Sequence, residues 1–237
     1  MSGPTIVLVH GGGFDSRCWD LAIPYLEHPV LAVDLPGRGS RPGPLESVSF
    51  AGCGQAIVED VEAAGVREAV LVGHSLGGSS IIPAVGRLDE RVRHIVFVAA
   101  IVPRHGNGTH QEWTEDLRES IDDERRSGRG TLSPDRVAKL FGNDLDEEGL
   151  AWCMAHLVPE AERLTTEPVD LTPLRSGVPR SWVLTTRDAI MKPAMQRRFL
   201  GNVGEGCEVV ELDAGHMCMI SQPATLAGIL DGIAASY

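Results

Sequence analysis

The chain has 237 residues, 43% of them hydrophobic and 23% charged, which is typical of one large soluble domain with an extensive core. It carries 33 acidic and 21 basic residues, a formal net charge of −12, and this disfavours nucleic acid as a partner because such binding depends on Lys and Arg at phosphates. We expect no signal peptide and no membrane partner, since a strand pattern begins almost at once and no apolar run approaches about 18 residues.

The first hundred residues alternate between predicted strands and predicted helices. Apolar runs predict strands over residues 5–9, 30–34, 68–73 and 92–98. Amphipathic stretches between them predict helices near residues 17–27, 49–64 and 76–87. This alternation predicts the α/β class, with a mainly parallel, doubly wound sheet that is covered by helices on both faces.

The alternation stops between about residues 103 and 177, where the pattern predicts short amphipathic helices at 111–126, 134–141 and 147–156. It then resumes with strands at 181–186 and 207–212 and helices near 193–201 and 223–235. The insertion follows the strand that ends near Ala99, at the carboxyl edge where the loops of a parallel sheet gather. We therefore expect a core domain of residues 1–102 and 178–237 and a helical cap of residues 103–177.

The most informative motif is Gly73-His74-Ser75-Leu76-Gly77, which joins a predicted strand to a predicted helix. A residue at such an abrupt corner is held in a strained backbone conformation, with its side chain projecting above the sheet. A phosphate loop would need G-x-x-x-x-G-K-[ST] and a dinucleotide site G-x-G-x-x-G, and neither spacing occurs here. We therefore predict that Ser75 is a nucleophile, with a purely structural turn as the alternative.

A serine hydroxyl needs a base and a carboxylate to become a good nucleophile. His216 lies in a loop after the predicted strand 207–212, and Asp188 lies just past the strand 181–186. Asp34 also ends a strand, but it belongs to a turn-rich segment early in the chain, where we expect it to bind its own loop. We expect His74 to pack against the sheet, and we predict His216 as the base and Asp188 as the acid that orients it.

An oxyanion hole would complete this site, because two backbone N–H groups aimed at the carbonyl oxygen lower the barrier to attack on an acyl carbon. One donor is expected to be the N–H of Leu76, directly after the nucleophile. The other is expected from the glycine run after the first strand, where Gly12 is the preferred donor and Gly13 the alternative. Glycines that only make a tight turn are the structural alternative.

These motifs together resemble the α/β-hydrolase superfamily, in which the triad follows the chain order serine, acid, histidine. The segment from Gly215 to Pro223 is most similar to the branch of plant methylesterases and hydroxynitrile lyases. The resemblance implies the triad roles given above and a helical cap inserted after the sixth-strand position of that fold. Lyases of the branch carry a lysine after the histidine and a hydroxyl-bearing residue in the first-strand loop. Met217 and Gly12 stand at those positions here, which favours the esterase side.

The sequence therefore predicts a serine hydrolase that cleaves a small, largely apolar carboxylic ester through a covalent acyl-enzyme. Hydrolysis of a thioester, a lactone or a carbon–carbon bond would use the same parts. A slow-turnover ligand receptor of the same fold is an alternative from another class. Apolar side chains beneath the cap could line the pocket, and the substrate-binding candidates are Gly13, Phe14, Trp152 and Met217, with Trp113, Met154 and Leu157 as further cap residues.

No cofactor and no metal is expected for this chemistry. The five cysteines are odd in number and lack paired short spacing, which favours reduced thiols and a cytoplasmic location over disulfides or a zinc site. Arg38 is the nearest candidate for binding an anion. The expected partner is a small-molecule ester, and a homodimer is compatible with the sequence.

Overall fold

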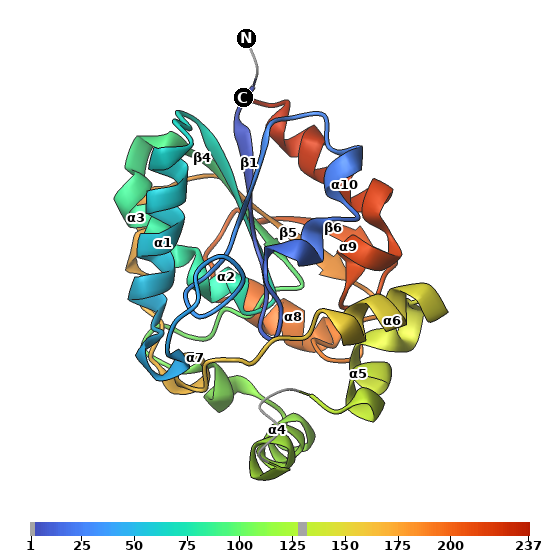
Figure 1. The fold of residues 1–237 in the computed structure, drawn as a ribbon. Coiled ribbons are helices and arrows are strands. Elements are labelled where there is room, and N and C mark those ends of the chain that lie inside the picture. The colour runs from blue at the N-terminus through green and yellow to red at the C-terminus, as the bar shows by residue number, and fades with distance from the viewer. Residues whose placement is uncertain (1–2, 128–131) are drawn as a thin grey trace.

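A six-stranded parallel sheet forms the centre of the computed structural model, which describes residues 3–127 and 132–237 (Figure 1). The strands lie in the order β2-β1-β3-β4-β5-β6. Their bounds are β1 Thr5–Val9, β2 Val30–Val33, β3 Ala69–His74, β4 Val92–Val98, β5 Arg180–Thr185 and β6 Glu208–Leu212. All five strand pairs are parallel, so every carboxyl end lies at the same edge of the sheet. The predicted α/β class and doubly wound sheet are confirmed.

The two faces of the sheet bury different side chains because successive residues of a strand point to opposite sides. Val7 and Val9 of β1 pack into one apolar cluster, whereas Ile6 and Leu8 pack into the other. The strands β1 and β3 therefore read as continuous apolar runs, as expected for strands that are buried on both faces.

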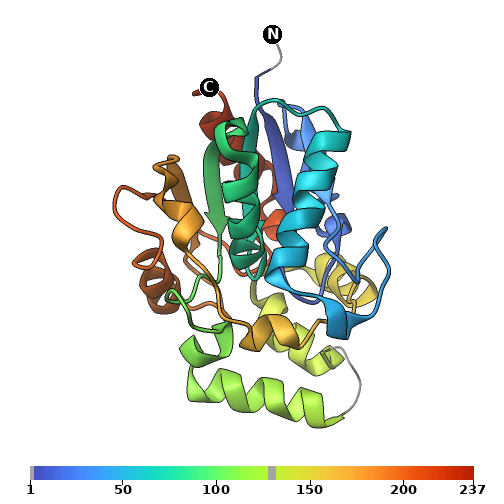
Figure 2. The same ribbon diagram turned by 90° about the vertical axis from the view of Figure 1, so that its left-hand side faces the viewer.

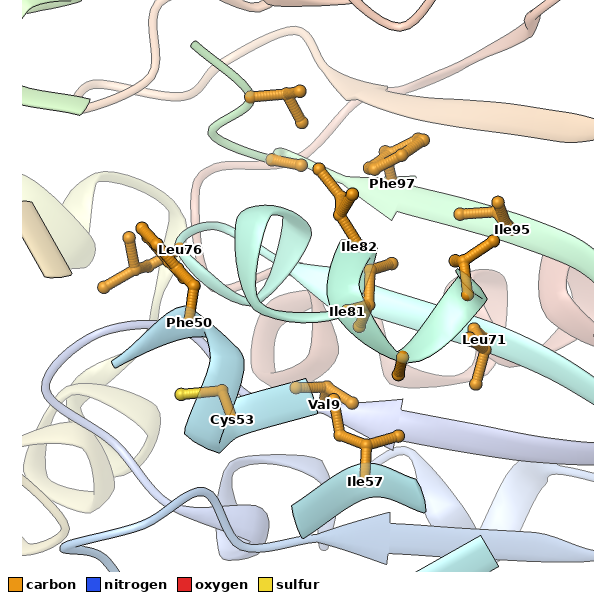
Figure 3. Close-up of a cluster of buried hydrophobic side chains, with 14 of the residues drawn as sticks. Val9, Phe50, Cys53, Ile57, Leu71, Leu76, Ile81, Ile82, Ile95 and Phe97 are labelled. Atoms are coloured by element: carbon orange, nitrogen blue, oxygen red, sulfur yellow. The ribbon is translucent and has the colours of Figure 1, made fainter. Parts of the chain in front are cut away.

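Helices α1 (Phe50–Ala63) and α3 (Ile82–Leu88) pack side by side over one face (Figure 2). The apolar cluster beneath them includes Phe97 and Ile57, which Figure 3 shows with their neighbours. Helix α10 (Pro223–Ala234) covers the other face, and α8 (Pro193–Leu200) follows β5. The short helices α2 (Gly77–Ser80) and α9 (Cys218–Ser221) begin at the carboxyl edge of the sheet.

The segment between β4 and β5 contributes helices and no strand among its described residues. Its α-helices are α4 (Glu115–Ser127), α5 (Pro134–Phe141), α6 (Glu147–Ala155) and α7 (Arg163–Thr166). Figure 1 places these helices at the end of the sheet opposite the two termini, which is the carboxyl edge of the strands. The division of the chain into residues 1–102 and 178–237 as core and 103–177 as cap remains our proposal.

Two predicted helices differ from the structure. The segment 17–27 forms two 3₁₀ turns, Ser16–Trp19 and Ile23–Tyr25, instead of one helix. The predicted helix 76–87 is divided into α2 and α3 at Ile81, two residues before Pro83, which lacks an N–H to continue a helical ladder. No helix in the described ranges is long and apolar enough to cross a membrane.

Candidate active site

The turn between β3 and α2 holds Ser75 in a left-handed backbone conformation, with φ of 50°. The backbone of Ser75 is held on both sides, since its N–H donates to Val98 O at 3.0 Å and its carbonyl accepts from Ile101 N at 2.8 Å. A non-glycine residue pays a conformational cost in this region and stays there only when its surroundings enforce it. The corner expected from the sequence is therefore present, and 8% of the surface of Ser75 is exposed.

The two glycines that flank this corner are required by close backbone approach. A Cβ at Gly77 would lie 2.5 Å from the carbonyl oxygen of His10, and a Cβ at Gly73 would lie 2.7 Å from the carbonyl oxygen of Gly77. Neither backbone atom can retreat as a flexible side chain could. The glycine spacing that identified the motif is therefore a packing requirement of the turn.

His216 and Asp188 form the hydrogen-bonded pair that the sequence predicted. His216 lies in the loop between β6 and α9, Asp188 lies after β5, and His216 Nδ1 is 2.7 Å from Asp188 Oδ2. Both residues are 3% exposed. Burial alone would raise the pKa of Asp188, but the neighbouring His216 and the backbone N–H groups of Ile190 and Met191 outweigh it and lower this pKa. Asp188 is therefore a carboxylate that holds the Nδ1–H of His216.

The elbow and the histidine loop meet through His74, the residue before Ser75. His74 Nε2 lies 2.9 Å from the backbone oxygen of His216, and the two imidazole rings are 4.8 Å apart. Burial first, and then the nearby His216, lower the pKa of His74 to about 3, so His74 is neutral and its Nε2–H donates to that oxygen. His74 thus supports the backbone of His216, which refines the packing role expected from the sequence.

No hydrogen bond joins Ser75 Oγ to His216 within the described part of the chain. Catalytic hydrogen bonds in unliganded enzymes are often long and tighten when substrate binds. The three side chains are nevertheless gathered at one edge of the sheet, because the turn after β3 and the loops after β5 and β6 all lie there.

The backbone N–H groups of Gly12 and Leu76 have no hydrogen-bond partner among the described residues. Leu76 is buried, where an unpaired N–H is costly, whereas Gly12 is half-buried. By contrast, the N–H of Gly13 donates to Glu160 Oε2 at 3.0 Å. This difference favours Gly12 over Gly13 as the loop's oxyanion donor.

Residues 158–160, which we call the clamp segment, fasten the glycine loop from the cap side. Val158 N donates to Gly13 O at 2.9 Å, while Glu160 accepts from Gly13 N. The other carboxylate oxygen of Glu160 pairs with the guanidinium of Arg38, which also donates to Pro36 O. Sequence reasoning missed Glu160 and left Arg38 as a candidate anion site, whereas the buried Arg38 is already paired.

The candidate substrate-binding side chains lie in different surroundings. Phe14 and Met217 are almost fully buried in the apolar cluster on the α10 side, and Phe14 meets Phe141 edge to face with ring centroids 5.6 Å apart. Phe141 in turn lies 5.7 Å from the His216 ring, so the end of α5 reaches this histidine. Trp152 stacks on His156 at 3.8 Å.

Two clefts on the described surface lie apart from these residues. The first, of about 410 Å³, is lined by His105, by apolar side chains and by three arginines, Arg104, Arg175 and Arg180. The second, of about 310 Å³, includes Trp113 and Glu112. Neither is lined by Ser75, Asp188 or His216, and these three residues are buried.

The sequence matches the model of the alpha/beta hydrolase family over residues 6–229. The chain belongs to the α/β-hydrolase family. A probable esterase of rice, PIR7A, is 31% identical over an alignment of 259 positions, which covers 99% of this chain and 98% of the relative. Methylesterase 17 of Arabidopsis thaliana is 26% identical and covers 98% of this chain and 92% of its own length. The predicted resemblance to plant methylesterases is thereby confirmed.

The fold of this α/β hydrolase also matches solved structures. An extracellular α/β-hydrolase from a Paenibacillus species superimposes with a TM-score of 0.86 at 22% identity, covering 98% of each chain. The family relatives are carboxylic ester hydrolases, and the prediction of an enzyme of this class is confirmed.

Proposed function

We propose that this α/β hydrolase is a serine esterase that cleaves small, largely apolar carboxylic esters through a covalent acyl-enzyme. One observation carries the proposal. Ser75 stands at a strained turn with φ of 50°, at the same sheet edge as a buried histidine whose Nδ1 is 2.7 Å from a carboxylate. This combination supplies a nucleophile, a base and a group that fixes the base's tautomer.

The reaction begins when the Nε2 of His216 takes the hydroxyl proton of Ser75 while the serine oxygen attacks the ester carbonyl. Asp188 stays ionised, holds the Nδ1–H of His216 and stabilises the imidazolium that forms. The imidazolium then gives its proton to the departing alcohol, which leaves an acyl group on Ser75. Water, deprotonated by His216, hydrolyses this acyl-enzyme and releases the carboxylic acid.

The N–H groups of Gly12 and Leu76 are proposed to bind the oxyanion that forms during both steps. Their lack of a partner among the described residues supports this role, because neither has a bond to give up when charge develops. Preorganised donors of this kind each contribute about 10² to 10³ in rate in enzymes that use them.

The apolar surroundings support a small, weakly polar substrate. Phe14 and Met217 lie beside the site, and the cap brings Phe141 to His216. Because one relative is named a methylesterase, methyl esters are the first esters to test. Because Ser75 is only 8% exposed, we propose that the cap moves to admit substrate.

The test is hydrolysis of a panel of methyl, ethyl and p-nitrophenyl esters with acyl chains of increasing length, with matched thioesters and lactones. We expect saturable hydrolysis of short apolar esters by the wild type and a loss of kcat by as much as about 10⁶-fold in Ser75→Ala. Ser79→Ala is the matched control, because this serine is fully buried one turn into α2 and donates to Ile101 O. Wild-type turnover by Ser75→Ala would overturn the proposal.

A further inference from the structure

Behind the carboxylate of Asp188 lies a fully buried polar pair, Thr185 at the end of β5 and Gln196 on α8. Neither side chain has any exposed surface. Buried polar groups of this kind are costly unless every donor and acceptor is paired, so the direction of their hydrogen bonds can be read from the partners.

The orientation of the Gln196 amide follows from two groups that can only donate. Its Oε1 lies 3.2 Å from Thr185 N and 3.4 Å from Trp182 Nε1, and both carry hydrogens. The amide NH₂ therefore faces the other way, where it lies 2.7 Å from Met191 O, 2.9 Å from Thr185 Oγ1 and 3.0 Å from Thr185 O, all of which can accept. If the amide were flipped, its NH₂ would face Thr185 N–H and Trp182 Nε1–H, donor to donor.

The hydroxyl of Thr185 therefore accepts a hydrogen from Gln196, and its own hydrogen is free to go to Asp188. Thr185 Oγ1 lies 3.1 Å from Asp188 Oδ2, the same oxygen that holds His216 Nδ1. The other oxygen, Oδ1, accepts the backbone N–H groups of Ile190 and Met191 at 2.9 and 2.7 Å. Each carboxylate oxygen of Asp188 thus has two donors.

We propose that Thr185 and Gln196 are positioning residues, which aim Asp188 Oδ2 at His216 and moderate the negative charge on that oxygen. The inference rests on the proposed triad. Neither residue touches substrate. Gln196 fixes the direction of the Thr185 hydroxyl. The hydroxyl then donates to Asp188 Oδ2, the same oxygen that accepts the Nδ1–H of His216.

Removing the hydroxyl should leave more negative charge on the oxygen that faces His216. That charge favours the positively charged form of the base, which cannot accept the serine proton, so the acid limb of kcat/KM should move upward. The other titratable groups facing the pair are His74 from β3, Cys218 from α9 and Asp144, which accepts Gly215 N. None of these is altered by a change at Thr185.

The experiment compares Thr185→Val, which keeps the shape and loses the hydroxyl, with Thr185→Ser, which keeps the hydroxyl. For each variant, kcat/KM for one ester is measured from pH 4.5 to 9 and divided by the fraction of active sites in a burst titration. We expect the acid limb of Thr185→Val to move up by about half a pH unit, with kcat lower by about tenfold because Asp188 loses one of the groups that position it. We expect Thr185→Ser to match the wild type.

A spectroscopic readout keeps the test independent of turnover. The low-field proton resonance of His216 Nδ1–H is expected to move downfield in Thr185→Val and to return in Thr185→Ser, since the bond to Oδ2 strengthens when its second donor is lost. An unchanged acid limb and resonance in Thr185→Val would overturn the inference, and so would equal changes in the serine variant. Failure of the proposed function would instead appear as turnover in Ser75→Ala.

Gln196→Glu provides a second variant. A carboxyl group at this place must be protonated, because the oxygen that replaces the NH₂ faces Met191 O and Thr185 O. This neutral acid donates to a carbonyl and accepts from the Thr185 hydroxyl, which then turns away from Asp188. We expect the same upward shift of the acid limb as in Thr185→Val, and no further shift when the two changes are combined. Additive shifts would contradict a single chain of hydrogen bonds.

Discussion

The two oxygens of Asp188 serve different partners, and this asymmetry predicts the effect of a single-atom change. Oδ1 accepts two backbone N–H groups, while Oδ2 accepts His216 Nδ1 and the Thr185 hydroxyl. In Asp188→Asn the amide oxygen should remain with the backbone donors, because an NH₂ there would meet them donor to donor. The NH₂ would then face His216.

We therefore expect Asp188→Asn to lower kcat by about 10⁴-fold. An NH₂ that donates to Nδ1 forces the imidazole proton onto Nε2, and a protonated Nε2 cannot accept the proton of Ser75. Steady-state kinetics on a short ester measure this loss. Asp213→Asn is the control, because that carboxylate is 81% exposed and pairs with Arg187 on the surface. A kcat within threefold of the wild type in Asp188→Asn would contradict the assigned role.

At the scale of elements, the clamp segment joins the helical segment between β4 and β5 to the glycine loop. The two backbone groups of Gly13 and the carboxylate of Glu160 form this contact, with the buried Arg38 behind it. A Cβ at Gly12 would lie 2.9 Å from Glu160 Oε2, so the carboxylate lies directly against the proposed oxyanion donor. Glu160 thus helps to set where the Gly12 N–H points.

We expect Glu160→Ala to lower kcat about tenfold with a smaller change in KM, because a loosened oxyanion donor acts mainly in the transition state. The variant should also unfold at lower temperature, since Arg38 would be left buried without its partner. Glu160→Gln, which keeps an acceptor for Gly13 N, should recover part of kcat. Glu148→Gln, on the exposed face of α6, is the control for a lost cap charge. An unchanged kcat in Glu160→Ala would refute the positioning role.

The elements themselves show what the sequence can predict. Gly73 and Gly77 lie within two residues of Ser75, so a local pattern reports a local corner. Glu160 lies 147 residues from Gly13, and nothing near either residue signals the contact. The hydroxyl of Thr185 and the amide of Gln196 were missed for a similar reason, since a buried strand end and a helix position become partners only when α8 packs on β5.

The alternation of apolar runs and amphipathic stretches was likewise enough to predict the class of fold but not the details of helices. The segment 17–27 has helical spacing, yet it forms two short turns, and Pro24 lies in the second of them. The Asp15 side chain accepts Arg17 N and begins the first turn. Such choices depend on Cys18 and Trp19 of the first turn packing into the apolar cluster on the α10 side, which periodicity does not describe.

At the scale of the whole molecule, several buried neutral histidines tie stability to pH. Burial lowers the pKa of His94 to about 4 and the pKa of His10 to about 4, and that of His74 to about 3, from an ordinary 6.5. Between about pH 6.5 and 4 these histidines therefore bind protons in the unfolded chain but not in the folded chain. Stability is full above this window and is lost as the pH falls through it.

His94 is the histidine best suited to test this link, because it lies away from the proposed site. Its Nε2 is 2.8 Å from Ser181 Oγ and its Nδ1 is 2.9 Å from the Tyr237 hydroxyl, with no carboxylate in this contact. As the pH is lowered near pH 5, the free energy of unfolding should fall more steeply in the wild type than in His94→Gln. We expect the two slopes to differ by about 1 kcal/mol per pH unit. Urea unfolding at pH 7, 6 and 5 measures the slope, and equal slopes would contradict the prediction.

The proposed esterase activity depends on one reactive hydroxyl, so covalent labelling tests this proposal most directly. The wild-type protein is treated with a fluorophosphonate, digested, and the labelled peptide is identified by mass spectrometry. We predict one label per chain, on Ser75, with ester hydrolysis lost in proportion to labelling and no label in Ser75→Ala. A label on another residue that tracks the loss of activity, or full ester hydrolysis by a chain labelled at Ser75, would contradict it.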